Sequence, residues 1–110
     1  MSSIGSSAWI AALDESCRGL PPTSGRAFVA QQAIDGTDLA WFVVADDDGV
    51  RVRPGRHPAP DVAIEQDAAT AAAIEAGALS AQLAFLDGRL RVSGDVGRLP
   101  ELAALLLAAA

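Results

Sequence analysis

The stretch "AFLDGRLRVSGD", Ala84 to Asp95, decides the fold, because a helix ends, a strand forms and the chain turns again within it. In residues 89–92, arginine alternates with an apolar side chain, and this period of two predicts a strand with one apolar face. Gly88 and Gly94 flank the run, and glycine is the residue that turns a backbone sharply. The stretch therefore predicts a short strand with a tight turn at each end.

Two aspartates, Asp87 and Asp95, stand beside these glycines, and they could belong either to a chemical site or to the turns. Aspartate is common in turns and helix caps because its short side chain bonds to nearby backbone N–H groups. We interpret both as turn and cap residues. The apolar side chains of the stretch are then its functional part, predicted to face apolar volume: Phe85, Leu86, Leu90 and Val92.

Outward from this stretch, the apolar periodicities predict a small α+β domain. They give a helix from residue 8 to the prolines at 21–22, strands over 26–34, 39–45, 50–53 and 61–66, helices over 67–77 and 79–88, the strand just described, and a closing helix from residue 100. This order predicts a mostly antiparallel sheet with helices on one face, over residues 8–110. Residues 1–7 are predicted to be a flexible tail.

Composition argues against several classes of protein. The net charge is −6 and the pI about 4.4, whereas a nucleic-acid surface needs dense positive charge. The apolar run over 102–110 is far shorter than the ~20 residues that span a bilayer, so no stable membrane insertion is expected. Cys17 is the one cysteine, which predicts a cytoplasmic protein without disulfides. All eight basic residues are arginine, as in GC-rich bacterial sequences.

Polar clusters that suggest chemistry have simpler interpretations. The "DDDG" at Asp46–Gly49 lacks the ligand spacing of a calcium loop and is typical of a hairpin turn. His57 stands in a proline-rich loop without a nearby acid or nucleophile, which favours an exposed loop histidine. We therefore predict no catalytic residue, no metal site and no cofactor.

One basic patch, defined by Arg51, Arg53, Arg56 and His57, has two open interpretations. It is either the hydrated face of an edge hairpin, where charge discourages aggregation, or a contact for an anionic membrane surface or an acidic partner. The sequence does not decide its role.

The second half of the chain, "PDVAIEQDAATAAAIEAGALSAQLAFLDGRLRVSGDVGRLPELAALL", resembles the sterol carrier protein type-two family. The likeness lies in a strand, a helix ending in glycine, a short helix with Ala84-Phe85, and the pattern G-x-L-x-V-x-G-D over 88–95. The resemblance implies a five-stranded sheet covered on one face by helices, with an apolar tunnel between them. It also implies binding of fatty acids, acyl-CoAs or sterol-like lipids without catalysis.

The interior has two interpretations, a filled core or an elongated cavity that holds a lipid. We take the cavity as the first hypothesis, and its predicted lining is Phe28, Trp41, Val43, Ile74, Leu83, Phe85, Leu86, Leu102 and Leu106. The strand at 39–45 is apolar on both faces, so Phe42 is the alternative to Trp41 as the inward residue. The second hypothesis is an accessory module without cargo, which docks on a partner enzyme or forms a homodimer through its apolar helix face.

Overall fold

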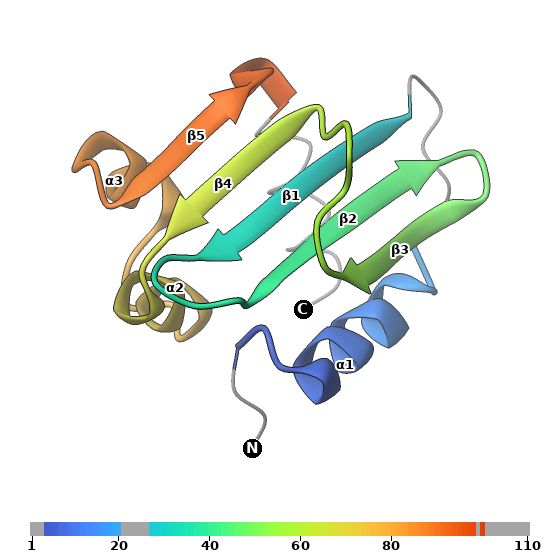
Figure 1. The fold of residues 1–110 in the computed structure, drawn as a ribbon, viewed down its shortest axis with the longest axis horizontal. Coiled ribbons are helices and arrows are strands. Elements are labelled where there is room, and N and C mark those ends of the chain that lie inside the picture. Colours follow the sequence, from blue (N-terminus) through green and yellow to red (C-terminus); the bar gives the residue numbers. More distant parts are fainter. Residues whose placement is uncertain (1–3, 21–26, 99, 101–110) are drawn as a thin grey trace.

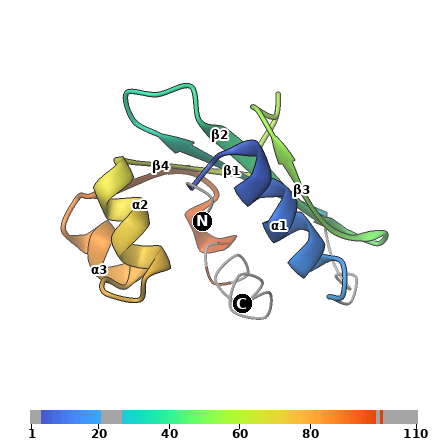
Figure 2. The same cartoon turned by 90° about the horizontal axis from the view of Figure 1, so that it is seen from below.

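The computed structural model describes residues 4–20, 27–98 and 100, which form a five-stranded sheet with its helices on one face (Figures 1 and 2). The elements in chain order are α1 (Ser7–Cys17), β1 (Phe28–Ile34), β2 (Ala40–Asp46), β3 (Gly49–Pro54), β4 (Val62–Gln66), α2 (Ala68–Glu75), α3 (Ala81–Leu86), β5 (Leu90–Gly94) and the 3-10 turn η1 (Val96–Arg98). The predicted α+β class and order are confirmed. The closing helix predicted from residue 100 lies almost wholly outside the described residues.

The sheet has the strand order β3-β2-β1-β4-β5. β1, β2 and β3 form the predicted antiparallel meander, and β4 pairs with β5 in the same sense. β4 lies parallel to β1, because the connection after β3 crosses over β2 and β1 before β4 begins (Figure 1). This crossing puts β1 at the centre of the sheet.

Turn and cap residues act largely as predicted. The β2–β3 hairpin turns at residues 47–48, and Gly49 takes the positive φ of 115°. Three helices begin at a side-chain cap, since Ser6, Asp67 and Ser80 each accept a backbone N–H of the first turn. The "DDDG" stretch is therefore a hairpin turn, as interpreted from sequence.

The first described residues belong to the folded domain and not to a tail. Ile4 packs against the core, and Gly5 is buried beside Trp41, to which a Cβ at position 5 would approach within 3.1 Å. Ser6 caps α1, and Ser7 is its first residue. The boundary predicted at residue 7 therefore lies too late in the chain, because small polar residues at 5–7 are a helix cap here.

The outer face of the sheet, opposite the helices, is partly covered by the β3–β4 connection. Gln31 points to this face, and it is buried although its side chain is polar. Its amide donates to the carbonyls of Trp41 and Gly55 and accepts the N–H of His57 at 2.7 Å. His57 is half-buried and lies edge-on against Phe42, so the prediction of an exposed loop histidine is also wrong.

α1 covers the free edge of β3 through the carboxylate of Asp14. This side chain is buried and accepts the Val52 N–H at 2.8 Å, a donor that β2 does not use. Arg18 and Arg53 pair with the same carboxylate at 3.2 and 3.0 Å. The Asp14 side chain thus satisfies the free edge of β3, and the two arginines neutralise the charge of its carboxylate.

Replacing Asp14 by asparagine should lower the free energy of unfolding by about 1–2 kcal/mol. Asparagine still offers an oxygen to Val52 but loses the charge that pairs with Arg18 and Arg53. These arginine side chains are 72 % and 50 % exposed, so water hydrates them in the variant. Urea unfolding measures the change, and Glu15→Gln, exposed on the same helix, is the control with the same change in charge.

The pH dependence of this difference tests the ion pairs. Burial raises the pKa of Asp14, but the Val52 N–H, Arg53 and Arg18 together lower it further, so the net pKa is below its ordinary value. A carboxylate of this kind stabilises the fold above its unfolded pKa, near about 4, and the contribution is lost as pH falls through the folded pKa. The gap between wild type and Asp14→Asn should therefore shrink below about pH 4. If the difference in unfolding free energy between wild type and Asp14→Asn stays the same in acid, the ion pairs of Asp14 are not its cause.

Candidate functional site

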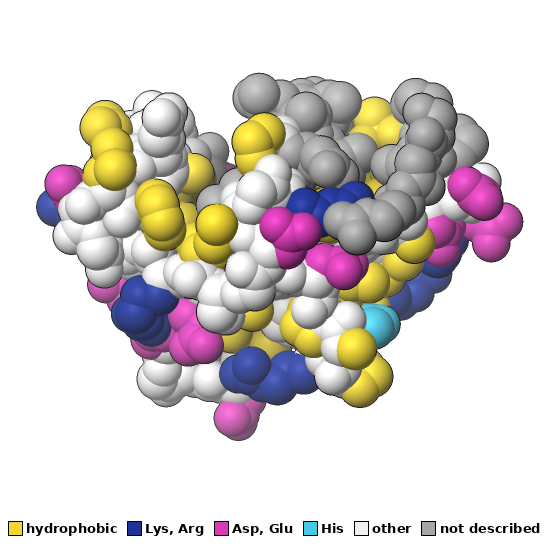
Figure 3. All heavy atoms as spheres, turned by 90° about the horizontal axis from the view of Figure 1, so that it is seen from above, with side chains coloured by type: hydrophobic (Ala, Val, Ile, Leu, Met, Phe, Trp, Pro, Cys, Tyr) yellow, Lys and Arg dark blue, Asp and Glu magenta, His cyan; other side chains and the backbone are white. Residues whose placement is uncertain are grey.

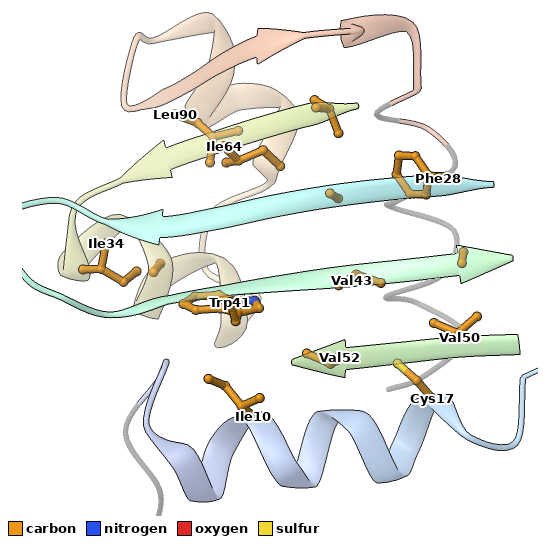
Figure 4. Close-up of a cluster of buried hydrophobic side chains, with 14 of the residues drawn as sticks. Ile10, Cys17, Phe28, Ile34, Trp41, Val43, Val50, Val52, Ile64 and Leu90 are labelled. Carbon is orange, nitrogen blue, oxygen red and sulfur yellow. The ribbon is translucent and has the colours of Figure 1, made fainter. Parts of the chain in front are cut away.

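The inner face of the sheet, which the helices cover, is the candidate site. Strand register places its side chains in rows, with Phe28 opposite Ala45 and Ala30 between Val43 and Val62. Most of these side chains are apolar and buried, and Figure 4 shows them along the strands and on α1. α1 flanks this face on one side, and α2 and α3 on the other (Figure 2).

The inner face combines alanines with larger apolar side chains. Ala30 lies at its centre, and Ala45 lies beside Phe28 at one end. Both alanines are fully buried. Large side chains lie toward the two ends of the face, Trp41 and Ile34 at one and Phe28 at the other (Figure 4). The face is therefore apolar over its whole length, with the small side chain of Ala30 at its centre.

Four of the predicted lining residues lie at this face or pack against its core. Phe28, Trp41 and Val43 point inward and are buried, which resolves the choice between Trp41 and Phe42. Ile74 on α2 is half-buried and packs against the core. Their role in lining a cavity stays a prediction.

The residues predicted on α3 are placed differently. Leu83 is 55 % exposed, Phe85 43 % and Leu86 71 %, whereas Ala84 is the buried side chain of this helix. Figure 3 shows hydrophobic side chains at the surface on this side of the molecule. In the adjoining strand, Leu90 is buried and Val92 half-buried. The predicted lining residues Leu102 and Leu106 lie outside the described residues.

The sequence interpretation missed polar side chains on the inner face. Gln32 lies opposite Trp41, and Gln66 lies opposite Ile34 and Leu90. Both glutamines are more than nine-tenths buried. The signal was present, because a period of two from Phe28 reaches Gln32 and a period of two from Val62 reaches Gln66.

The opposite end of the inner face carries a buried arginine, Arg98 of η1. Its guanidinium lies 4.7 Å from the centre of the Phe28 ring and donates to the carbonyl of Ala27 at 3.2 Å. A cation on an aromatic face is stabilised by the ring quadrupole. The two ends of the face therefore differ, since one carries neutral amides and the other a cation.

The basic patch is partly neutralised within the domain. Arg51 pairs with Asp46 at 2.7 Å, and hydrogen bonding to this arginine is the main cause that lowers the pKa of Asp46. Arg53 pairs with Asp14. These pairs favour the hydrated-hairpin interpretation over a contact with an anionic membrane.

Alternative sites are weak in the described part of the chain. No group of three or more His, Cys, Asp or Glu side chains is placed to hold a metal ion among the described residues. One depression of about 220 Å³ lies beside α2, and its lining is polar or small: Asp67, Ala69, Thr70, Ala73 and Arg89. Within the described ranges, no helix has the length and apolarity to cross a membrane.

A five-stranded sheet in the order β3-β2-β1-β4-β5, with helices over its apolar face, is the architecture of the sterol-carrier class. The chain belongs to the SCP-2 sterol transfer family, whose model matches residues 20–107. The sequence resemblance is thereby confirmed, and the matched segment includes every strand of the sheet.

Solved structures with the same fold include whole proteins and part of a larger enzyme. Sterol carrier protein 2 from Yarrowia lipolytica, in its apo form, is 18 % identical over 99 % of this chain and 94 % of its own, with a TM-score of 0.69. Palmitated SCP2L2 from Aedes aegypti is 21 % identical over 88 % and 93 %, with a TM-score of 0.63. The sec-alkylsulfatase Pisa1 from Pseudomonas sp. is 20 % identical over 72 % of this chain, with a TM-score of 0.60, but the match spans only 13 % of the sulfatase. A search of curated proteins gave no significant match.

Proposed function

We propose that this protein binds an apolar lipid, of the fatty-acid, acyl-CoA or sterol-like class, between the inner face of its sheet and the helices. The observation that carries the proposal is the inner face itself, which is apolar and covered by the helices of a sterol-carrier fold. The palmitated state of the Aedes aegypti relative supports a ligand with an acyl chain. The function needs no cofactor and no catalytic residue.

Binding would come from the transfer of the lipid chain out of water. Each Å² of apolar surface buried contributes about 25 cal/mol, so a long acyl chain supplies most of the affinity without polar contacts. α3 would form the rim of the site, because its large apolar side chains are exposed although Ala84 anchors the helix. A contiguous group of exposed apolar side chains is typical of an interaction or ligand-binding surface.

Replacing Leu83 by arginine should weaken lipid binding at least about tenfold, since a charge at an apolar rim must lose water when the ligand enters. Leu83 is 55 % exposed, so the variant should fold. Displacement of a fluorescent fatty acid measures binding, and native mass spectrometry shows whether lipid co-purifies. Gln82→Arg adds the same charge to the same helix without removing an apolar side chain, and it should bind like the wild type.

The outcomes separate lipid binding from other uses of the fold. Apo protein that shows no response to the fluorescent fatty acid would count against lipid binding. If Leu83→Arg folds and binds lipid as tightly as the wild type, α3 does not form the rim of the site. We propose the cytoplasm as the compartment, because the buried thiol of Cys17 is free and the domain needs no disulfide.

A second candidate function is docking on a partner enzyme or a second copy of the chain through the apolar side of α3. The exposed Leu83, Phe85 and Leu86 favour it, and the sulfatase match shows this fold as part of a larger chain. Analytical ultracentrifugation of the lipid-free protein measures its mass in solution and shows whether it forms a dimer. A dimer that Leu86→Arg dissociates, together with absence of bound lipid, would favour this function over lipid carriage.

A further inference from the structure

Two buried polar atoms on the inner face have no hydrogen-bond partner in the described part of the chain, the indole Nε1 of Trp41 and the amide Oε1 of Gln66. Trp41 is 2 % exposed and Gln66 5 %. A polar atom that is buried without a partner destabilises the fold, so native proteins keep few of them. These two lie on the face that the proposed function assigns to the lipid, which suggests that the ligand supplies the partner.

The two side chains lie at the same end of the sheet. Trp41 pairs in register with Gln32 of β1, and Gln66 pairs with Ile34 of the same strand. They are therefore diagonal neighbours across β1, about 12 Å apart at Cα from standard strand spacing and rise. Both side chains are long enough to reach a group that lies over β1.

The chemistry of the two atoms defines the group they can bind. An indole N–H only donates and an amide oxygen only accepts, whereas a hydroxyl does both. A carboxylate offers Gln66 no proton. The charged side chains at this end are of both signs, since Asp67 lies near Arg89 and Arg91, but both arginines are exposed. Asp67 follows Gln66 directly, and Glu75 accepts the indole N–H of Trp9, whose ring lies 4.8 Å from that of Trp41.

The buried cation that an acid head group would require lies elsewhere. Arg98 stacks on Phe28, and Phe28 is at the far end of the inner face from Trp41 (Figure 4). An uncharged head group is therefore favoured at the Gln66 end. Resting on the proposed function, we infer that Gln66 and Trp41 select a neutral lipid with a hydroxyl head group, such as a long-chain alcohol.

The inference is tested with three probes that share a sixteen-carbon chain, hexadecanol, palmitate and hexadecane, each displacing a fluorescent lipid. The wild type should bind hexadecanol about tenfold more tightly than the other two, the effect of about one net hydrogen bond to a buried group. Gln66→Leu and Trp41→Phe should each lose most of this preference, measured as the ratio of the alcohol and alkane affinities of the same variant. Gln82→Leu, the same change at an exposed position of α3, should keep it.

A measurement without ligand separates recognition from a structural role. Ligand-free Gln66→Leu should unfold at the same or a higher urea concentration than the wild type, since it removes an unpaired acceptor. A clear loss of stability would mean that Gln66 is bonded within the fold and would overturn the inference. Equal affinity for alcohol and alkane, or a preference for palmitate, would overturn it while leaving lipid binding intact. Failure of all three probes to bind would contradict the proposed function as well.

Discussion

Replacing Gly94 by alanine should lower the free energy of unfolding by about 3–5 kcal/mol. Gly94 has a φ of +87°, and a Cβ there would lie 2.5 Å from the carbonyl oxygen of Asp61. That oxygen accepts the N–H of Asp95 at 2.7 Å, while the carboxylate of Asp61 accepts the N–H of Val29 at 2.7 Å. The oxygen cannot withdraw without loosening β1, β4 and the end of β5 together.

Gly88 gives the matched control at the other end of the same strand. Its φ is +78°, but a Cβ there meets nothing within 4 Å. Gly88→Ala should therefore lower the free energy of unfolding by only about 1–2 kcal/mol, the cost of placing alanine in the left-handed backbone conformation. Urea unfolding of both variants measures the difference. If the two changes cost the same, the close approach to Asp61 does not constrain the fold.

The strands around Gly88 and Gly94 differ in how far the sequence determines them. Alternation and turn residues predict β5 and its neighbours, since each depends on a few residues along the chain. The parallel pairing of β1 with β4 depends instead on a connection that crosses the sheet and is held by Gln31 and Asp61. These contacts join residues far apart in sequence, and local patterns carry no signal for them.

The candidate site divides in the same way. A period of two places Trp41 and Val43 on one face of β2, but the pairing of β1 with β2 is needed to put Phe28 on the same face. α3 has only six residues, less than two turns, so its sequence does not fix which side chain faces the sheet. The large residues Leu83, Phe85 and Leu86 were predicted to face inward, but Ala84 is the side chain that α3 buries.

The unpaired atoms of the inner face connect stability with the proposed function. A face optimised only for stability would carry leucine in place of Gln66, because an apolar residue of similar size leaves no unpaired acceptor. Sites that bind ligands commonly sacrifice stability in this way. The unpaired polar atoms of Trp41 and Gln66 and the cation beside Phe28 then give the inner face two chemically distinct ends.

Replacing Trp41 by alanine should lower the free energy of unfolding by about 3–5 kcal/mol, the usual range for an aromatic residue truncated in a core. Trp41 joins β2 to the first turn of α1, because its ring meets Trp9 edge-on and covers Gly5. Phe42→Ala is the control at the next residue. Phe42 lies on the outer face, half-buried against His57, and its loss should cost about 1–2 kcal/mol.

A lipid should act differently on the two variants. A ligand that binds only the folded state stabilises it by mass action. In Trp41→Ala the new volume opens on the inner face, where an acyl chain can enter it, so saturating fluorescent fatty acid should raise the melting temperature more than in Phe42→Ala. Equal shifts in the two variants would contradict an inner-face site, because the cavity left by Phe42 opens on the side of the sheet away from the helices.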